Sequence, residues 1–202
     1  MRSLKVLLFF VAILMVFNTF VLAAVTGDAP IKGETPFLLT NAGQGPGGKM
    51  ARLLMFQSKA LLPTDFDYNA EPLKEDSTDL TKKDYEILFV IIGSSAKGLG
   101  ASGITIDDEI KRLNLMIEEA KKLGMTIIAA QIEGDARRGK TGSADERSID
   151  AIIPFADYII VKKDGDSDGK FTNMAQELGV PITYIDETLD FMQVVQQMFP
   201  TE

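Results

Sequence analysis

The sequence predicts a single α/β domain, a three-layer sandwich with a mainly parallel sheet of about five strands, of Rossmann-like or flavodoxin-like type. Short apolar runs rich in β-branched residues alternate along the chain with amphipathic helical segments, which indicates βαβ units. The runs at 85–93 and 125–132 are apolar almost throughout, as expected of central strands covered by helices on both faces. Ligands of such sheets bind outside the carboxyl ends of the strands, so the loops that follow the strands are the candidate site.

The order of elements follows from the apolar pattern. Strands are expected at 36–42, 85–93, 125–132, 156–161 and 181–185, with a weaker one at 64–68. Helices are expected at 49–62, 106–123, 144–155, 171–178 and 188–199. The second of these helices has one apolar face made of Ile106, Ile110, Leu113, Ile117 and Ala120.

The first residues, 1–23, have the layout of a secretory signal peptide. A basic start leads into an unbroken apolar run from Val6 to Phe17, and Val21-Leu22-Ala23 offers a cleavage site. An uncleaved anchor is the alternative, but this run is short for a bilayer span. We therefore expect an exported protein, periplasmic or extracellular, with no stable membrane insertion after cleavage. A flexible N-terminal tail is expected at 24–36 and a single α/β domain at 37–202.

Composition excludes several kinds of chemistry. The chain has no His, no Cys and no Trp, which excludes zinc sites built on Cys or His, a Ser-His-Asp triad and a Cys nucleophile. It carries 21 Lys and Arg against 29 Asp and Glu, a formal net charge of −8. An acidic chain argues against nucleic acid and against anionic membrane surfaces as partners.

The loop after the first strand contains Gly43, Gly45 and Gly48 in the spacing G-x-G-x-x-G, between an expected strand and an expected helix. That context is typical of a dinucleotide-binding turn, and Asp65 and Asp67 follow at about the distance of the acidic residue that binds the ribose. The alternative is a tight turn that only glycine permits and that lines a pocket without a nucleotide. We favour the tight turn, because exported domains rarely hold a dinucleotide.

The second glycine-rich loop contains Ser94 and Lys97 in the spacing S-x-x-K, and a K-T-G sequence follows later. Both motifs occur in penicillin-recognising enzymes, where the Lys lies one helical turn after the Ser. We expect no helix here, because Gly98 and Gly100 disfavour one. Two interpretations stay open: a different Ser/Lys pair with Ser94 or Ser95 as nucleophile, and a polar loop that binds an anion.

The stretch GDARRGKTG at 134–142 contains the P-loop pattern G-x-x-x-x-G-K-[ST]. In a P-loop the Lys and the Thr begin the helix, whereas here Ser143 and Glu146 form a capping box that starts a helix after the motif. We therefore expect no nucleotide site. Arg137 and Arg138 remain as basic residues in an acidic chain, either solvated or available as bidentate donors to a carboxylate or phosphate.

The fourth loop is acidic. Asp164, Asp166 and Asp168 match the first half of an EF-hand loop, but the twelfth position, a bidentate Glu in EF-hands, is Ala175. A calcium site here would therefore be weak. In the alternative interpretation the loop is an acidic turn in which Asp166 or Asp168 caps the following helix.

Four stretches together, LLTNAGQ, GSSAKGLGASGI, GDARRG and DSDGKFT, resemble a family of exported bacterial proteins, domain of unknown function 6305. The resemblance runs from about Pro36 to the C-terminus, and it implies one secreted α/β domain with no known activity. The family has polar residues where this chain has Pro46-Gly47-Gly48, and commonly His where Gln131 stands, so neither glycine motif is implied as a family feature. The resemblance implies a shared rim formed by the loops around Gln44, Ser94, Ser95, Lys97, Arg137, Arg138 and Asp168.

Three functions are compatible with these loops. The first is binding of a small anionic molecule, with no cofactor beyond a possible calcium ion. The second is a hydrolase in which Lys97 activates a serine and Glu133 or Asp135 is the acid or base. The third is an envelope protein that binds an unknown protein partner and has a weak calcium loop. The residues expected to hold the anionic ligand are Gln44, Ser94, Ser95, Lys97, Gly98, Gly100, Arg137 and Arg138.

Overall fold

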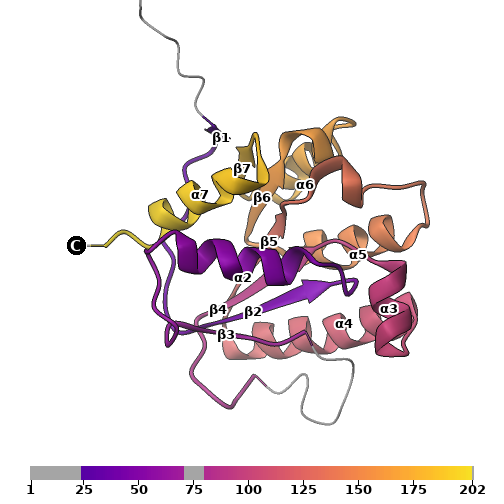
Figure 1. Cartoon of the computed structure of the whole chain (residues 1–202), viewed down its shortest axis with the longest axis horizontal. Helices are drawn as coiled ribbons and strands as arrows, with labels where there is room; N and C mark the ends of the chain where they lie inside the picture. The colour runs from indigo at the N-terminus through magenta and orange to yellow at the C-terminus, as the bar shows by residue number, and fades with distance from the viewer. Residues whose placement is uncertain (1–23, 71–79, 202) are drawn as a thin grey trace, which may run out of the picture.

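The computed structural model describes residues 24–70 and 80–201, so the signal peptide expected at 1–23 lies outside the described residues. A seven-stranded sheet forms its centre (Figure 1). The strands are β1 Val25–Gly27, β2 Phe37–Ala42, β3 Phe66–Tyr68, β4 Ile87–Ile92, β5 Thr126–Gln131, β6 Tyr158–Lys162 and β7 Ile182–Ile185. Their order across the sheet is β1-β7-β6-β5-β4-β2-β3. All neighbouring strands are parallel except β1, which runs antiparallel to β7.

The expectation of about five strands is wrong, because the sheet has seven. Strand β3 lies within the weaker strand expected at 64–68, whereas β1 was missed, because three residues are too few for an apolar pattern to stand out in the sequence. Strand β1 also corrects the expectation of a flexible tail at 24–36. Val25 pairs with Ile185, and the Asp28 carboxylate accepts a hydrogen bond from the Ile182 amide at 2.9 Å, which fixes this segment along the sheet edge.

Helices cover both faces of the sheet, so the three-layer α/β architecture is confirmed. The helices are α2 Gly47–Gln57, α3 Ala96–Ser102, α4 Ile106–Leu123, α5 Ala144–Ile152, α6 Lys170–Leu178 and α7 Phe191–Met198. One core contains the buried side chains of α2 and α7, which lie side by side (Figure 1), and the other core contains those of α4, α5 and α6. Within the described ranges, none of the helices has the length and apolar character needed to cross a bilayer.

The strand order places the sheet's switch point between β2 and β4. From β2 the chain moves outward to β3 at one edge, whereas from β4 it moves step by step toward β7 on the other side. The six parallel strands thus follow the doubly wound order of flavodoxin-like sheets, extended by one strand. Connections on the two sides of the switch point diverge, which leaves a crevice at the carboxyl ends of β2 and β4.

Helix α3 lies where none was expected. Its Ser95 hydroxyl caps the helix by accepting a hydrogen bond from the Gly98 amide at 3.1 Å, and Gly103 ends it with a left-handed φ of 68°. Leu99 is buried, so packing and capping outweigh the low helix propensity of the two glycines.

Candidate functional site

A cleft of about 1090 Å³ lies across the carboxyl ends of four neighbouring strands, β3, β2, β4 and β5. It is centred on the switch point and lined by Asn41, Gln44, Gly45, Pro46, Lys49, Tyr68, Asn69, Ala70, Ser95, Lys97, Gly98, Ala101, Ser102, Ile104 and Arg137. Among these described lining residues, Lys49, Lys97 and Arg137 are cationic and none carries a carboxylate. The cleft is therefore a cationic site in a chain whose formal net charge is −8.

Gln44 is held firmly at the floor of the cleft. Its backbone has a left-handed φ of 56°, and it forms an antiparallel bridge with Ser94. Its side-chain amide donates to the Ala70 carbonyl at 2.9 Å and to Glu109 Oε2 at 3.1 Å. Because its amide nitrogen is engaged in this way, Gln44 positions the loop rather than standing free to reach a ligand.

The support for this loop is a buried ion pair that sequence analysis missed. Glu109 and Arg112 on α4 are both fully buried, and Arg112 donates to Glu109 through Nη2 at 2.8 Å and Nε at 3.0 Å. Glu109 Oε1 also accepts the Gly43 amide at 3.1 Å, and Arg112 donates to the Asn41 carbonyl at 2.6 Å. One signal could have revealed the pair, because Glu109 lies on the same helical stripe as Leu113, four residues later.

Close contacts within the protein explain the glycines of the first loop. A Cβ at Gly43 would lie 2.5 Å from Ser94 Cα, and one at Gly45 would overlap the Gly93 carbonyl oxygen. One at Gly48 would lie 2.8 Å from Asn41 Oδ1. Glu133 Oε1 also lies beside Gly45. These close approaches account for the G-x-G-x-x-G spacing without a nucleotide, which favours the tight-turn interpretation.

Two glycines of α3 give opposite predictions for an alanine substitution. A Cβ at Gly98 would overlap the backbone carbonyl of Gln44, whereas one at Gly100 would meet nothing within 4 Å. We expect Gly98→Ala to destabilise the domain by about 1–3 kcal/mol, since the carbonyl belongs to a fixed loop. Gly100→Ala should instead stabilise it by about 0.5–1 kcal/mol through helix propensity. Urea unfolding of both variants measures the difference, and equal effects would contradict the assigned contact.

The two serines of the second loop have different environments. Ser94 is buried and its Oγ has no hydrogen-bond partner among the described residues, while Ser95 Oγ caps α3. No hydrogen bond joins Lys97 to either serine in the part of the chain that the structure describes. The Ser94 amide donates to Asp145 at 2.9 Å, and burial raises the pKa of that carboxyl group.

Arg137 and Arg138 have different environments although they are adjacent. Arg137 lines the cleft, and its side chain is held by Glu133 Oε2 at 2.9 Å and by the Ser94 carbonyl at 3.1 Å. Arg138 is not among the lining residues.

Of the eight residues expected to hold a ligand, the cleft contains Gln44, Ser95, Lys97, Gly98 and Arg137. Ser94 is buried, and Gly100 and Arg138 lie outside the lining.

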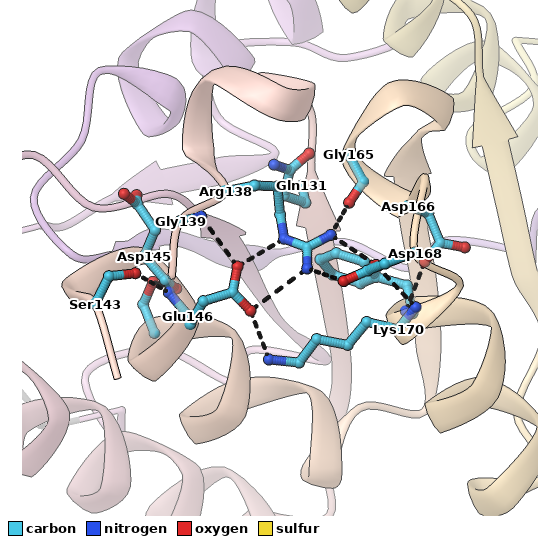
Figure 2. Close-up of polar contacts among 12 residues, drawn as sticks. Gln131, Arg138, Gly139, Ser143, Asp145, Glu146, Gly165, Asp166, Asp168 and Lys170 are labelled. Atoms are coloured by element: carbon cyan, nitrogen blue, oxygen red, sulfur yellow. Dashed lines mark hydrogen bonds and ion pairs between the residues drawn. The ribbon is translucent and has the colours of Figure 1, made fainter. Parts of the chain in front are cut away.

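Figure 2 shows Arg138 between Glu146 and Asp168, with the Lys170 side chain reaching the Glu146 carboxylate. Arg138 donates to Glu146 at 2.8 Å, to Asp168 at 2.7 and 3.0 Å and to the Gly165 carbonyl. Burial would raise the pKa of Glu146, but hydrogen bonds from Arg138 and Lys170 outweigh it and lower this pKa to about 2. The bidentate partners of Arg138 are thus carboxylates of its own chain.

The stretch 134–142 does not adopt P-loop geometry. It begins with the short 3-10 helix η1 Gly134–Arg137, and α5 starts only at Ala144. Ser143 caps α5 as expected, accepting from the Glu146 amide at 3.3 Å, while the Glu146 carboxylate turns away toward Arg138. Lys140 is exposed and lies before α5 rather than in its first turn, unlike the Lys of a P-loop.

The three aspartates of the acidic loop do not converge on one point. Asp164 pairs with Lys162 at 2.6 Å, Asp168 pairs with Arg138, and Asp166 caps α6 by accepting the Phe171 amide at 2.7 Å. Within 24–70 and 80–201, no group of three or more acidic side chains could hold a metal ion. The interpretation as a capping turn accounts for Asp166, and calcium binding by this loop stays a prediction.

The family described as domain of unknown function DUF6305 matches this sequence over residues 34–199. The chain belongs to the DUF6305 family. This match spans the cleft, both glycine-rich loops and the Arg138 cluster, which consists of Arg138, Glu146, Asp168 and Lys170. The DUF6305 domain therefore contains the whole candidate site.

Other comparisons add little to the DUF6305 assignment. No curated protein matches the sequence. Among solved structures, a PfkB family carbohydrate kinase from Listeria grayi is similar over 85% of this chain and 54% of its own, with 16% identity and a TM-score of 0.32. The DUF6305 chain thus spans about half the length of that kinase. A likeness this distant carries no functional information.

Proposed function

We propose that this DUF6305 protein is an exported binding protein for a small organic anion, which it holds in the cleft at the switch point of the sheet. The observation that carries the proposal is the charge of the lining. Three cations, Lys49, Lys97 and Arg137, face this space, and no carboxylate lies among the described lining residues. Crevices at this position are where doubly wound sheets hold their ligands.

The two lysines are available for a ligand. Both are exposed, and neither has a side-chain ion pair or hydrogen bond to any residue in the described ranges. Other lysines near the strand ends are occupied, for example Lys162, which pairs with Asp164, and Lys170, which pairs with Glu146. Lysines without a partner among the described residues, in a cleft whose described lining has no carboxylate, favour an anion.

The size of the cleft favours an organic ligand. About 1090 Å³ is at the upper end of the range for small-molecule pockets, far larger than an inorganic ion needs. Uncharged groups, among them Tyr68 and Asn41, share the lining with the cations. Export rests on the sequence of residues 1–23, so a periplasmic or extracellular metabolite is the class of ligand we propose.

Anion binding is preferred over the hydrolase. A serine nucleophile needs a base within hydrogen-bond reach, and Lys97 makes no such bond to Ser94 or Ser95 in the part of the chain that is described. The Ser94 hydroxyl is buried, and the Ser95 hydroxyl is engaged at the N-terminus of α3. These contacts support positions in a binding loop.

A panel of carboxylates and phosphates tests the proposal by calorimetry and thermal shift. Lys49→Ala/Lys97→Ala should weaken binding of any hit about tenfold, as expected for two exposed charges. A saturating ligand at roughly a hundred times its Kd should add about 2.7 kcal/mol to wild-type stability.

The matched control removes two lysines that lie near the amino-terminal ends of the strands, away from the cleft. Lys32 adjoins Gly33, which bonds to the Met198 carbonyl, and Lys122 lies in the last turn of α4, ahead of β5. Lys32→Ala/Lys122→Ala has the same charge as the cleft variant and should bind like wild type. Equal losses in both double variants would mean non-specific charge attraction, and absence of any hit in wild type would end the proposal.

A further inference from the structure

We propose that Arg137 recognises the oxyanion group of the ligand, a carboxylate or a phosphate, and that Glu133 is the residue that positions it. This inference rests on the proposed function, because it assigns the ligand's anionic group to one place in the same cleft. In this assignment Arg137 forms directional hydrogen bonds with the anionic group, whereas Lys49 and Lys97 only contribute positive charge.

The guanidinium of Arg137 is fixed but not saturated. Its Nε donates to Glu133 Oε2 at 2.9 Å and its Nη1 donates to the Ser94 carbonyl at 3.1 Å. A guanidinium has five N–H groups, so three are left without a partner among the described residues. The side chain is 23% exposed and belongs to the cleft lining, so these free donors are accessible to a ligand.

Glu133 is held in place by glycines. Its side chain is 8% exposed, and its Oε1 is buried with no hydrogen-bond partner among the described residues. A Cβ built at Gly47 would lie 2.7 Å from this oxygen, one at Gly93 3.0 Å and one at Gly45 3.6 Å. The carboxylate thus fills a space that the two glycine-rich loops leave, and its one ion-pair partner among the described residues is Arg137.

A buried carboxylate must keep its cationic partner, so Glu133 restricts Arg137 to one orientation. Pre-ordering a donor in this way reduces the entropy that binding would otherwise cost. Oxyanions suit the arrangement because planar or tetrahedral oxygens accept two parallel N–H bonds from one guanidinium, whereas a lysine offers only a point charge.

Arg138 provides the contrast that makes the assignment specific. Its side chain is 11% exposed, and its three nitrogens bond to Glu146, Asp168 and the Gly165 carbonyl. It has no donor left for a ligand, although it is the neighbour of Arg137 and of the same residue type.

The experiment uses isotope-labelled protein, with inorganic phosphate and malonate as probes. Arg137→Lys keeps the charge but loses the fork, so it should weaken the better probe by about tenfold to a hundredfold. Arg52→Lys, at an exposed position of α2, is the matched control and should bind like wild type. Preference for phosphate over malonate, or the reverse, identifies which oxyanion the site takes.

The role of Glu133 has a readout that needs no ligand. In wild type the Nε–H proton of Arg137 should exchange slowly with water, since it is bonded to a buried carboxylate. Glu133→Gln should speed this exchange and weaken probe binding, while the backbone amide spectrum keeps its native dispersion. Unchanged exchange and affinity in Glu133→Gln would overturn the positioning role.

The outcomes also separate this inference from the proposed function. If wild type binds a probe and Arg137→Lys binds it equally well, the inference is wrong while the anion site stands. If wild type binds neither probe nor any member of the wider panel, both are wrong.

Discussion

Arg112→Met is expected to lower the free energy of unfolding by about 3–5 kcal/mol, because it leaves the fully buried carboxylate of Glu109 without its cation. Every N–H of Arg112 lies within reach of an acceptor, and the acceptors besides Glu109 include the Asn41 carbonyl and the Thr40 hydroxyl. Methionine is close in length but replaces none of these bonds. The buried charge, rather than lost volume, should therefore dominate the effect.

A second substitution separates charge from packing. In Arg112→Met/Glu109→Gln the buried charge is gone, and the glutamine oxygen can still accept the Gly43 amide that Glu109 Oε1 accepts at 3.1 Å. This double variant should be more stable than Arg112→Met alone, although it has lost one more native side chain. Urea unfolding monitored by circular dichroism measures both. A double variant that unfolds as easily as the single one would show that packing, not charge, sets the loss.

The Glu109–Arg112 pair should also affect ligand binding in the cleft. Glu109 holds Gln44 and Gly43, whose loop forms the cleft floor and whose Gln44 carbonyl lies against Gly98. Loss of the pair should therefore weaken anion binding even in molecules that remain folded. The anchor of the site thus lies on α4, more than sixty residues along the chain from the loop that it holds.

The main architecture could be predicted because it depends on local patterns. The runs that became β4 and β5 are apolar almost throughout, and burial on both faces requires that composition whatever the partners are. Positions after the strands could be assigned to the site for the same reason. Edge strand β1 was missed because three residues carry no periodicity, and its pairing with β7 depends on a segment far along the chain.

The details of the site could not be predicted, because they depend on contacts between distant segments. Nothing in the sequence distinguishes Arg137 from Arg138, yet the turn through η1 directs one into the cleft and the other toward Glu146. Helix α3 was missed because glycine propensity is a local rule, whereas Gly98 is needed for close contact with Gln44. Ser143 and Glu146 gave the correct helix start, but the Glu146 side chain acts elsewhere.

Low pH should reduce the stability of the domain, because it protonates the Glu146 carboxylate. Glu146 has a pKa of about 2 in the folded protein against an ordinary value of 4.5, since hydrogen bonds from Arg138 and Lys170 outweigh the effect of burial. A lowered folded pKa contributes stability that is complete above about pH 4.5 and is lost as the pH falls toward 2. The difference between these two pKa values corresponds to about 3 kcal/mol of stability at neutral pH. Solvent screens little of this contribution, since the Glu146 side chain is only 7% exposed.

Glu146→Gln should therefore reduce the fall in unfolding free energy between pH 4.5 and pH 2 by about 3 kcal/mol, while being less stable than wild type at pH 7. The Asp168 carboxyl, whose pKa the Arg138 guanidinium also lowers to about 2, accounts for part of the fall that remains. The loss at pH 7 follows because Arg138 and Lys170 keep their charges, and among the described residues only Asp168 and Asp150 remain as their charged partners. The control is Glu118→Gln at an exposed position of α4, which should leave the pH profile unchanged. Urea midpoints measured from pH 2 to pH 7 compare the three proteins. A Glu146→Gln profile parallel to that of wild type would show that other carboxylates cause the acid sensitivity. It would also show that the Arg138 cluster does not stabilise the contact between the loops after β5 and β6.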